Sequence, residues 1–75
     1  MSTIRFSDGQ TTQADQIARA TLFPQESRLL IELKSGNVLR VAGETAVADA
    51  DMLDDVRDGQ HLQFLVFRVP AKVSN

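Results

Sequence analysis

The part of the chain richest in potentially reactive side chains is the run DADMLDDVRDG, which begins at Asp49 and contains five aspartates in eleven residues. Closely spaced carboxylates can bind a divalent cation, and the calcium loop of an EF-hand needs oxygen ligands at positions 1, 3 and 5 and glutamate at position 12. A loop that begins at Asp49 has Leu53 at position 5 and Gln60 at position 12, so it does not fit calcium. A carboxylate pair such as Asp51 and Asp55 would hold magnesium only weakly without further ligands.

Catalytic and cofactor chemistry has little support elsewhere in the sequence. His61 is the only histidine and there is no cysteine, so neither a catalytic histidine beside a nucleophile nor a zinc site is indicated. The four glycines are isolated from one another and do not have the spacing of a phosphate-binding loop. We therefore expect no enzyme activity, no cofactor and no bound metal.

The acidic run has the periodicity of an amphipathic helix. An apolar stripe forms on one side of the wheel, from Ala46, Ala50, Leu53 and Val56. The other side carries a row of carboxylates, Asp51, Asp55 and Asp58, flanked by Asp54. The helix is expected to begin after Thr45, or at Asp49 or Asp51, and to stop at Gly59. This acidic face is either a solvated surface or a docking site for lysine and arginine side chains of a partner protein.

Before this helix, apolar residues recur with the period of two that is typical of strands. Strands are predicted over residues 3–6, 16–23, 28–34 and 38–42, with turns between them. A four-residue loop at 24–27 would pair Leu22 with Leu29, Ala20 with Ile31, Ala18 with Leu33, and Arg19 with Glu32. A three-residue loop at 35–37, with Asn37 left-handed, would pair Leu33 with Leu39, Ile31 with Val41, and Glu32 with Arg40. The three strands would then share one apolar face, with an Arg19–Glu32–Arg40 ladder on the other.

The last strand, predicted over residues 61–70, is apolar on both sides. Leu62, Phe64 and Val66 share one face, while Leu65, Phe67 and Val69 share the other. A strand that is apolar on both faces must be covered twice. The helix can cover one face, and the other needs the N-terminal hairpin, closure into a barrel, or another chain. Self-association is therefore predicted through Phe23, Leu65, Phe67 and Val69, with Arg68 and Pro70 limiting edge aggregation.

Together these patterns predict one α+β domain over residues 1–75. It would be a small antiparallel sheet or partly closed barrel of four or five strands, with one helix before the last strand. Disorder is expected only at residues 1–3 and 71–75. A chain this short buries only about 60% of its unfolded surface, so packing, self-association or a partner must stabilise it.

One segment, IELKSGNVLRV at residues 31–41, resembles the strand–glycine turn–strand hairpin of many small β proteins. The order of strands followed by a helix also loosely resembles the DNA-binding domains of LytTR-type response regulators and small flagellar proteins of the FlbD kind. The basic recognition residues that such a DNA-binding domain requires are not matched in this sequence. The resemblance therefore assigns no family.

The net charge of −2 is unevenly distributed, because all six acidic residues of the second half fall between Glu44 and Asp58. Such a mild charge disfavours a general nucleic-acid binder. No apolar run is long enough to span a bilayer and no signal-peptide profile is visible, so a cytoplasmic protein without membrane partners is expected.

These observations favour a non-catalytic protein-binding adaptor or regulatory module that forms a homodimer. The first alternative is an acidic inhibitor from a mobile element, in which Asp51, Asp54, Asp55 and Asp58 occupy a basic nucleic-acid site on another protein. The second alternative is a small DNA-binding regulator that uses the basic side of the strands, formed by Arg19, Arg28, Lys34 and Arg40.

Overall fold

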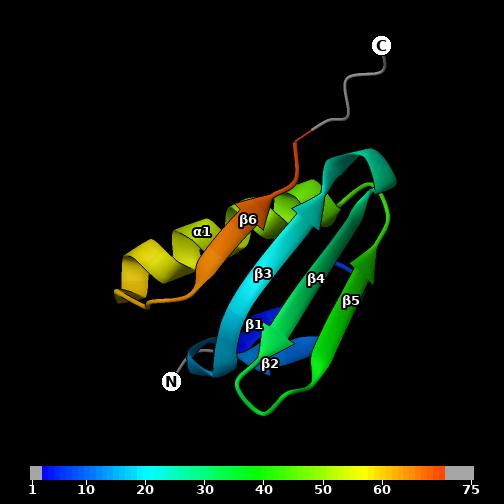
Figure 1. The fold of residues 1–75 in the computed structure, drawn as a ribbon. Helices are drawn as coiled ribbons and strands as arrows, with labels where there is room; N and C mark the ends of the chain where they lie inside the picture. Colours follow the sequence, from blue (N-terminus) through cyan, green and yellow to red (C-terminus); the bar gives the residue numbers. More distant parts are fainter. Residues whose placement is uncertain (1–2, 71–75) are drawn as a thin grey trace.

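The computed structural model describes residues 3–70, in which a sheet is covered on one side by a helix and a small hairpin (Figure 1). In chain order the elements are β1 (Thr3–Arg5), β2 (Thr11–Gln13), the 3-10 turn η1 (Ala14–Gln16), β3 (Ile17–Phe23), the 3-10 turn η2 (Pro24–Glu26), β4 (Arg28–Leu33), β5 (Val38–Ala42), α1 (Ala46–Gln60) and β6 (Leu65–Arg68). The predicted α+β class is confirmed, and the helix precedes the last strand. Disorder was predicted for residues 1–3, and the prediction is wrong for Thr3, which belongs to β1. The other residues predicted to be disordered, 1–2 and 71–75, lie outside the described residues.

The main sheet has the order β5-β4-β3-β6, and β1 pairs with β2 in a separate hairpin. The meander of β3, β4 and β5 is antiparallel, as predicted. The last strand departs from that prediction because β6 joins β3 in parallel, which makes the sheet mixed. Parallel strands need a crossover connection, and α1 supplies it between β5 and β6. The sheet is open among residues 3–70, so the barrel alternative does not occur.

The core lies between the sheet and the layer formed by α1 and the β1–β2 hairpin (Figure 1). Its buried residues are Ile4, Phe6, Ala14, Ile17, Ala20, Leu22, Leu29, Ile31, Val41, Ala46, Ala50, Leu53 and Phe64. The predicted helix stripe contributes three of them, and its fourth member, Val56, packs against the core while partly exposed. No described element covers the opposite side of the four-stranded sheet, which we call the open face.

A buried carboxylate fastens the hairpin to the helix. Asp49 is 7% exposed and accepts hydrogen bonds from the backbone N–H and the hydroxyl of Ser7, at 3.2 and 2.7 Å. The hydroxyl of Thr45 donates in turn to the Ser7 hydroxyl. Because Asp49 lies in the first turn of α1, the positive end of the helix dipole also stabilises its charge.

The predicted β3–β4 register is confirmed over most of its length and wrong at one end. Leu22 pairs with Leu29 and Ala20 with Ile31, but a bulge between Ile17 and Arg19 sets Ile17 opposite Leu33. The predicted partner, Ala18, is exposed. A bulge adds one residue and reverses the alternation beyond it. It places isoleucine rather than alanine in the core, and burying an isoleucine side chain contributes about 1.5–3 kcal/mol.

The predicted β4–β5 register is wrong by two residues. Ile31 pairs with Leu39, and Arg40 lies opposite Leu30 rather than Glu32. The loop begins one residue earlier than predicted, because Gly36 rather than Asn37 takes the left-handed conformation, with φ of 95°. Glycine adopts positive φ without a Cβ clash, so it is the better residue for this position. A shift of two residues preserves the alternation, and the predicted apolar face therefore survives.

The helix begins after Thr45, as predicted, but does not stop at Gly59. It continues to Gln60, and His61 takes the left-handed conformation with φ of 55°. The N–H of Leu62 then bonds to the carbonyl of Arg57 at 2.9 Å, which is typical of a helix C-terminus. Ending the helix here lets Leu62 pack against the core. His61 is thus a helix cap rather than the first residue of a strand.

Candidate functional site

The parallel pairing of β6 with β3 decides which side chains of β6 are available for binding. Residues that pair across adjacent strands point to the same face of a sheet. Val66 and Arg68 lie opposite the buried β3 residues Ala20 and Leu22, so they point toward α1. Leu65 and Phe67 alternate with them and therefore point to the open face.

An apolar strip consequently runs along one edge of the open face. We define the strip as Leu65, Phe67 and Val69, whose exposed fractions are 56%, 46% and 39%. Phe23 lies beside the end of the strip, partly buried, with the guanidinium carbon of Arg28 at 5.1 Å from its ring centroid. The structure thus brings together the four residues predicted for self-association, and their binding role stays a prediction.

The open face is hollowed at the end of the strip. A cavity of about 300 Å³ lies there, lined by Phe23, Pro24, Gln25, Glu26, Val69 and Pro70. The hollow combines the η2 turn with the segment that follows β6, so only the folded chain forms it. The hollow has both apolar and polar walls, and the exposed Phe67 lies on the strand that leads to it.

Two ion pairs form among the charged residues of the open face. Arg19 contacts Glu32 through two hydrogen bonds, of 2.6 and 3.1 Å, and Arg28 contacts Glu26 at 3.2 Å. The hydrogen bond from Arg19 lowers the pKa of Glu32 and raises that of Arg19. The predicted ladder stops at this pair, because Arg40 lies opposite Leu30. The basic side proposed for DNA binding is thereby partly neutralised.

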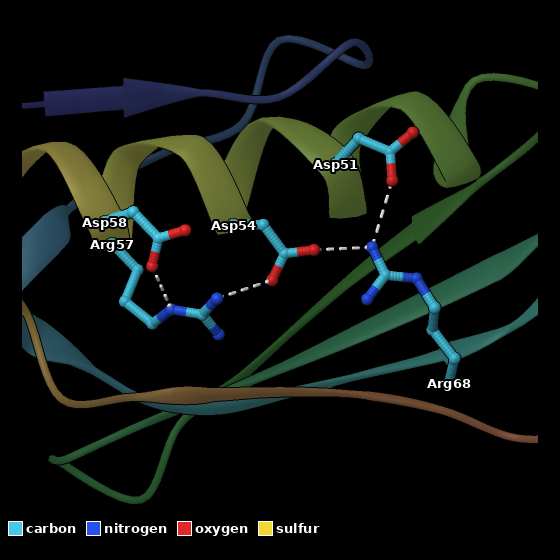
Figure 2. A network of polar contacts seen from close by, with 5 residues as sticks. All are labelled: Asp51, Asp54, Arg57, Asp58 and Arg68. Atoms are coloured by element: carbon cyan, nitrogen blue, oxygen red, sulfur yellow. Dashed lines mark hydrogen bonds and ion pairs between the residues drawn. The ribbon is translucent and has the colours of Figure 1, made fainter.

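Three of the four aspartates predicted to bind a partner lie on α1 beside two arginines, one on α1 and one on β6 (Figure 2). Arg68 Nη2 contacts Asp51 Oδ1 at 2.9 Å and Asp54 Oδ2 at 2.6 Å. Arg57 contacts the other oxygen of Asp54 and Oδ1 of Asp58, both at 3.1 Å. Asp55 alone among the four makes no ion pair within residues 3–70. Their role toward a partner stays a prediction, although much of their charge is balanced internally.

The sequence interpretation assigned Arg68 to limiting edge aggregation and missed its ion pairs with the helix. Its hydrogen bonds to Asp54, and then to Asp51, raise its pKa. It ties the last strand to the helix rather than acting only as a guard on an edge. The alternation of β6 could have predicted this role, because it places Arg68 on the row that faces the core. A charged residue in such a position needs an opposite charge on the element that covers the strand.

Residues 3–70 contain no further cluster of potentially reactive side chains. Among the described residues, no group of three or more histidine, aspartate or glutamate side chains gathers as a metal site. His61 caps the helix, and within residues 3–70 it makes neither a side-chain hydrogen bond nor an ion pair with a carboxylate. In the same part of the chain, no helix has the length and apolar character to cross a membrane.

A scan against protein-family models finds no match, and comparisons with curated proteins and with solved structures find none either.

Proposed function

We propose that this chain is a non-catalytic protein-binding module that associates with a second copy of itself through the open face. The apolar strip is the observation that carries the proposal. Leu65 and Phe67 are large apolar side chains exposed on a strand of only four residues. Contiguous exposed apolar surface is typical of protein interaction sites, whereas single exposed apolar residues are ordinary.

The features of the open face suit contact with an identical surface. In a two-fold dimer the same patch meets itself, so Phe67 of each copy can enter the hollow at Phe23 and Val69 of the other. An aromatic side chain that fills a pocket near the centre of an interface commonly contributes most of the binding energy. The Arg19–Glu32 pair is already formed within the chain, so dimerisation leaves neither charge without its partner. Sheets packed in this way lie about 10 Å apart.

This arrangement would leave both copies of α1 on the outside. The dimer would then present two copies of the acidic helix face, pointing away from each other. Such a bivalent surface supports the role of an adaptor or regulator, because two weak contacts made together bind more tightly than either alone.

Sedimentation of the purified protein over a range of concentrations tests self-association. We expect the wild type to form a dimer and Phe67→Asp to remain a folded monomer, because a carboxylate in the interface core would lose its hydration without a partner. Val47→Asp is the matched control: Val47 is 43% exposed but lies on α1, so this variant should dimerise like the wild type. A wild type that stays monomeric up to about 1 mM, or two variants that behave alike, would contradict the proposal.

A further inference from the structure

The last strand has one edge that no other strand pairs with in residues 3–70. In the sheet order β5-β4-β3-β6, β6 lies at the end and pairs only with β3. The N–H of Val69 bonds to the carbonyl of Leu22 on β3 at 2.9 Å. Because the N–H and C=O groups of successive residues in a strand point to opposite edges, those of Phe67 also face β3. The N–H and C=O groups of Val66 and Arg68 therefore face the unpaired edge.

The opposite edge of the sheet differs, because a side chain already occupies part of it. The Nε2 of Gln10 donates a hydrogen bond of 2.7 Å to the carbonyl of Arg40 on β5. In the described part of the chain, the side-chain hydrogen bonds at β6 are those of Arg68 to the helix, and none reaches the backbone of this strand. An unpaired edge can bind another extended chain, and proteins commonly cover such edges. The edge of β6 is therefore the one that can accept a further strand.

Different side chains border this edge on the two sides of the sheet. The open face carries the exposed Leu65 and Phe67. On the other side, the carboxylates of Asp51, Asp54 and Asp58 lie between α1 and β6 (Figure 2). The side chains of Asp51 and Asp58 are 67% and 73% exposed, and each forms its ion pair through Oδ1. Their Oδ2 atoms accept no hydrogen bond from residues 3–70, so they can still bind a cation of a partner.

We propose that the unpaired edge of β6 binds an extended segment of a partner protein, which becomes a fifth strand of the sheet. The backbone of the segment bonds to Val66 and Arg68 and lies about 4.8 Å from β6. Its alternate side chains are apolar on the open face, beside Leu65 and Phe67. On the other side they include lysine or arginine, which reaches Asp58. In this mode of recognition the main chain supplies affinity and the alternate side chains supply specificity.

The inference rests on the proposed protein-binding role and goes beyond self-association. A dimer packed through its open faces leaves both β6 edges unpaired, so each copy can bind one segment. A second copy of β6 is less suited to this edge than a basic segment of another protein. The basic residue on the side of β6 that faces the helix is Arg68, and Asp51 and Asp54 of its own chain already hold it.

Amide hydrogen exchange of the ¹⁵N-labelled full chain tests the inference, with a capped hexapeptide of alternating lysine and valine as the probe. In the free protein, the N–H groups of Val66 and Arg68 should exchange faster than those of Phe67 and Val69, which face β3. The peptide should slow exchange at Val66 and Arg68 in a saturable way. Sedimentation of the same samples reports self-association, so the failure of either proposal is visible without the other.

Peptides that are methylated on backbone nitrogens separate strand pairing from simple charge attraction. In an extended peptide the lysine N–H groups point to one edge and the valine N–H groups to the other, so only one set can face β6. Methylation of that set should weaken binding at least about tenfold, because it removes several hydrogen bonds, and methylation of the other set should not. Asp58→Asn should weaken binding about twofold to fivefold, as expected for an exposed ion pair. The control is Glu44→Gln, which removes an exposed charge that precedes α1 and should not change binding.

Three results would overturn this inference. Slow exchange at Val66 and Arg68 in the free protein at every concentration would show that the edge is already paired. Slowing that grows with protein concentration in the absence of peptide would show that a second copy occupies the edge. Equal binding of the two methylated peptides would show attraction to the acidic side of α1 without addition of a strand.

Discussion

The two faces of the four-stranded sheet are made by alternate residues of the same strands, yet they end in different surroundings. Ile31 and its neighbour Leu30 are nearly identical in chemistry, but Ile31 is fully buried under the helix and Leu30 is only partly buried on the open face. The difference lies in what covers each face, not in the hydrophobicity of the strand. The covered face carries the buried core, and the open face carries apolar side chains that no described element covers.

The charges of the two faces differ as well. On the covered side, Arg68 points toward α1 and links a strand to a helix. On the open side, Arg19 and Glu32 link two neighbouring strands, and their side chains are 56% and 40% exposed. Charge on the covered side therefore joins layers, while charge on the open side only reinforces a register that apolar pairs already set.

Alanine substitution in the two faces of β4 tests this comparison most strongly. Ile31→Ala should lower the free energy of unfolding by about 2–5 kcal/mol, because it leaves a cavity in the core. Leu30→Ala should cost the monomer much less, since its side chain is only partly buried. Urea unfolding in the Phe67→Asp background, which is expected to be monomeric, measures both, and equal losses would contradict the difference in burial between the two faces.

Two substitutions at the C-terminal end of α1 should have a smaller effect on the free energy of unfolding, and they should raise it. His61→Gly should stabilise the protein by about 1 kcal/mol, because glycine takes the left-handed conformation without the cost that histidine bears. Gly59→Ala should stabilise it by about 0.5–1 kcal/mol, since Gly59 lies within the helix and an added Cβ meets nothing within 4 Å. Thermal unfolding measures both variants. A lower melting temperature for Gly59→Ala would mean that the helix stops at Gly59.

Removing the link between β6 and α1 should have a modest, salt-dependent effect. Arg68→Gln leaves Asp51 and Asp54 without this partner and should destabilise the protein by about 0.5–1 kcal/mol at low salt, because the pairs are partly exposed. The loss should shrink at high salt. Asp55→Asn is the control, since it removes a charge that forms no ion pair in the described chain. An equal loss in both variants in urea unfolding would argue against the network.

The smallest effect is expected at the Arg19–Glu32 pair and appears as a dependence on pH. The pKa of Glu32 is lower in the folded chain than its ordinary value of 4.5, so the pair contributes fully above that pH. The contribution is lost as the pH falls through the lower, folded pKa. The stability difference between the wild type and Glu32→Gln should therefore vanish in acid. Arg19→Gln should abolish the same pH dependence, and a difference that persists in acid would exclude this origin.

Local patterns predicted the meander well, and the failures have identifiable causes. The four-residue loop at 24–27 correctly implied the Leu22–Leu29 and Ala20–Ile31 pairs. The β4–β5 register was missed because asparagine and glycine both tolerate positive φ and the wrong one of two adjacent residues was chosen. The bulge at Ile17 was missed because the prediction assumed a strict period of two residues along the strand. That assumption leaves no place for the extra residue of a bulge.

The candidate surfaces were predictable only in part. The apolar alternation of β6 correctly separated Leu65 and Phe67 from the core-facing residues of that strand. The acidic side of α1 was also visible in the sequence. Its ion pairs with Arg68 were not, because they join residues 14 and 17 positions apart through a strand pairing that local patterns do not encode. A second cavity, beside η1, escaped for the same reason, since its walls come from four separate segments.

The sequence by itself determined the strand and helix periods, the apolar face of the meander and the presence of surplus apolar surface, because these depend on side chains a few residues apart. Only the tertiary structure decided that β6 lies parallel to β3, and that within residues 3–70 one face of the sheet is covered by α1 and the hairpin while the other is not. Each of these features depends on how segments that are distant in the sequence pack around a single core. The packing that buries the most apolar surface on one side of the sheet leaves the apolar strip exposed on the other side.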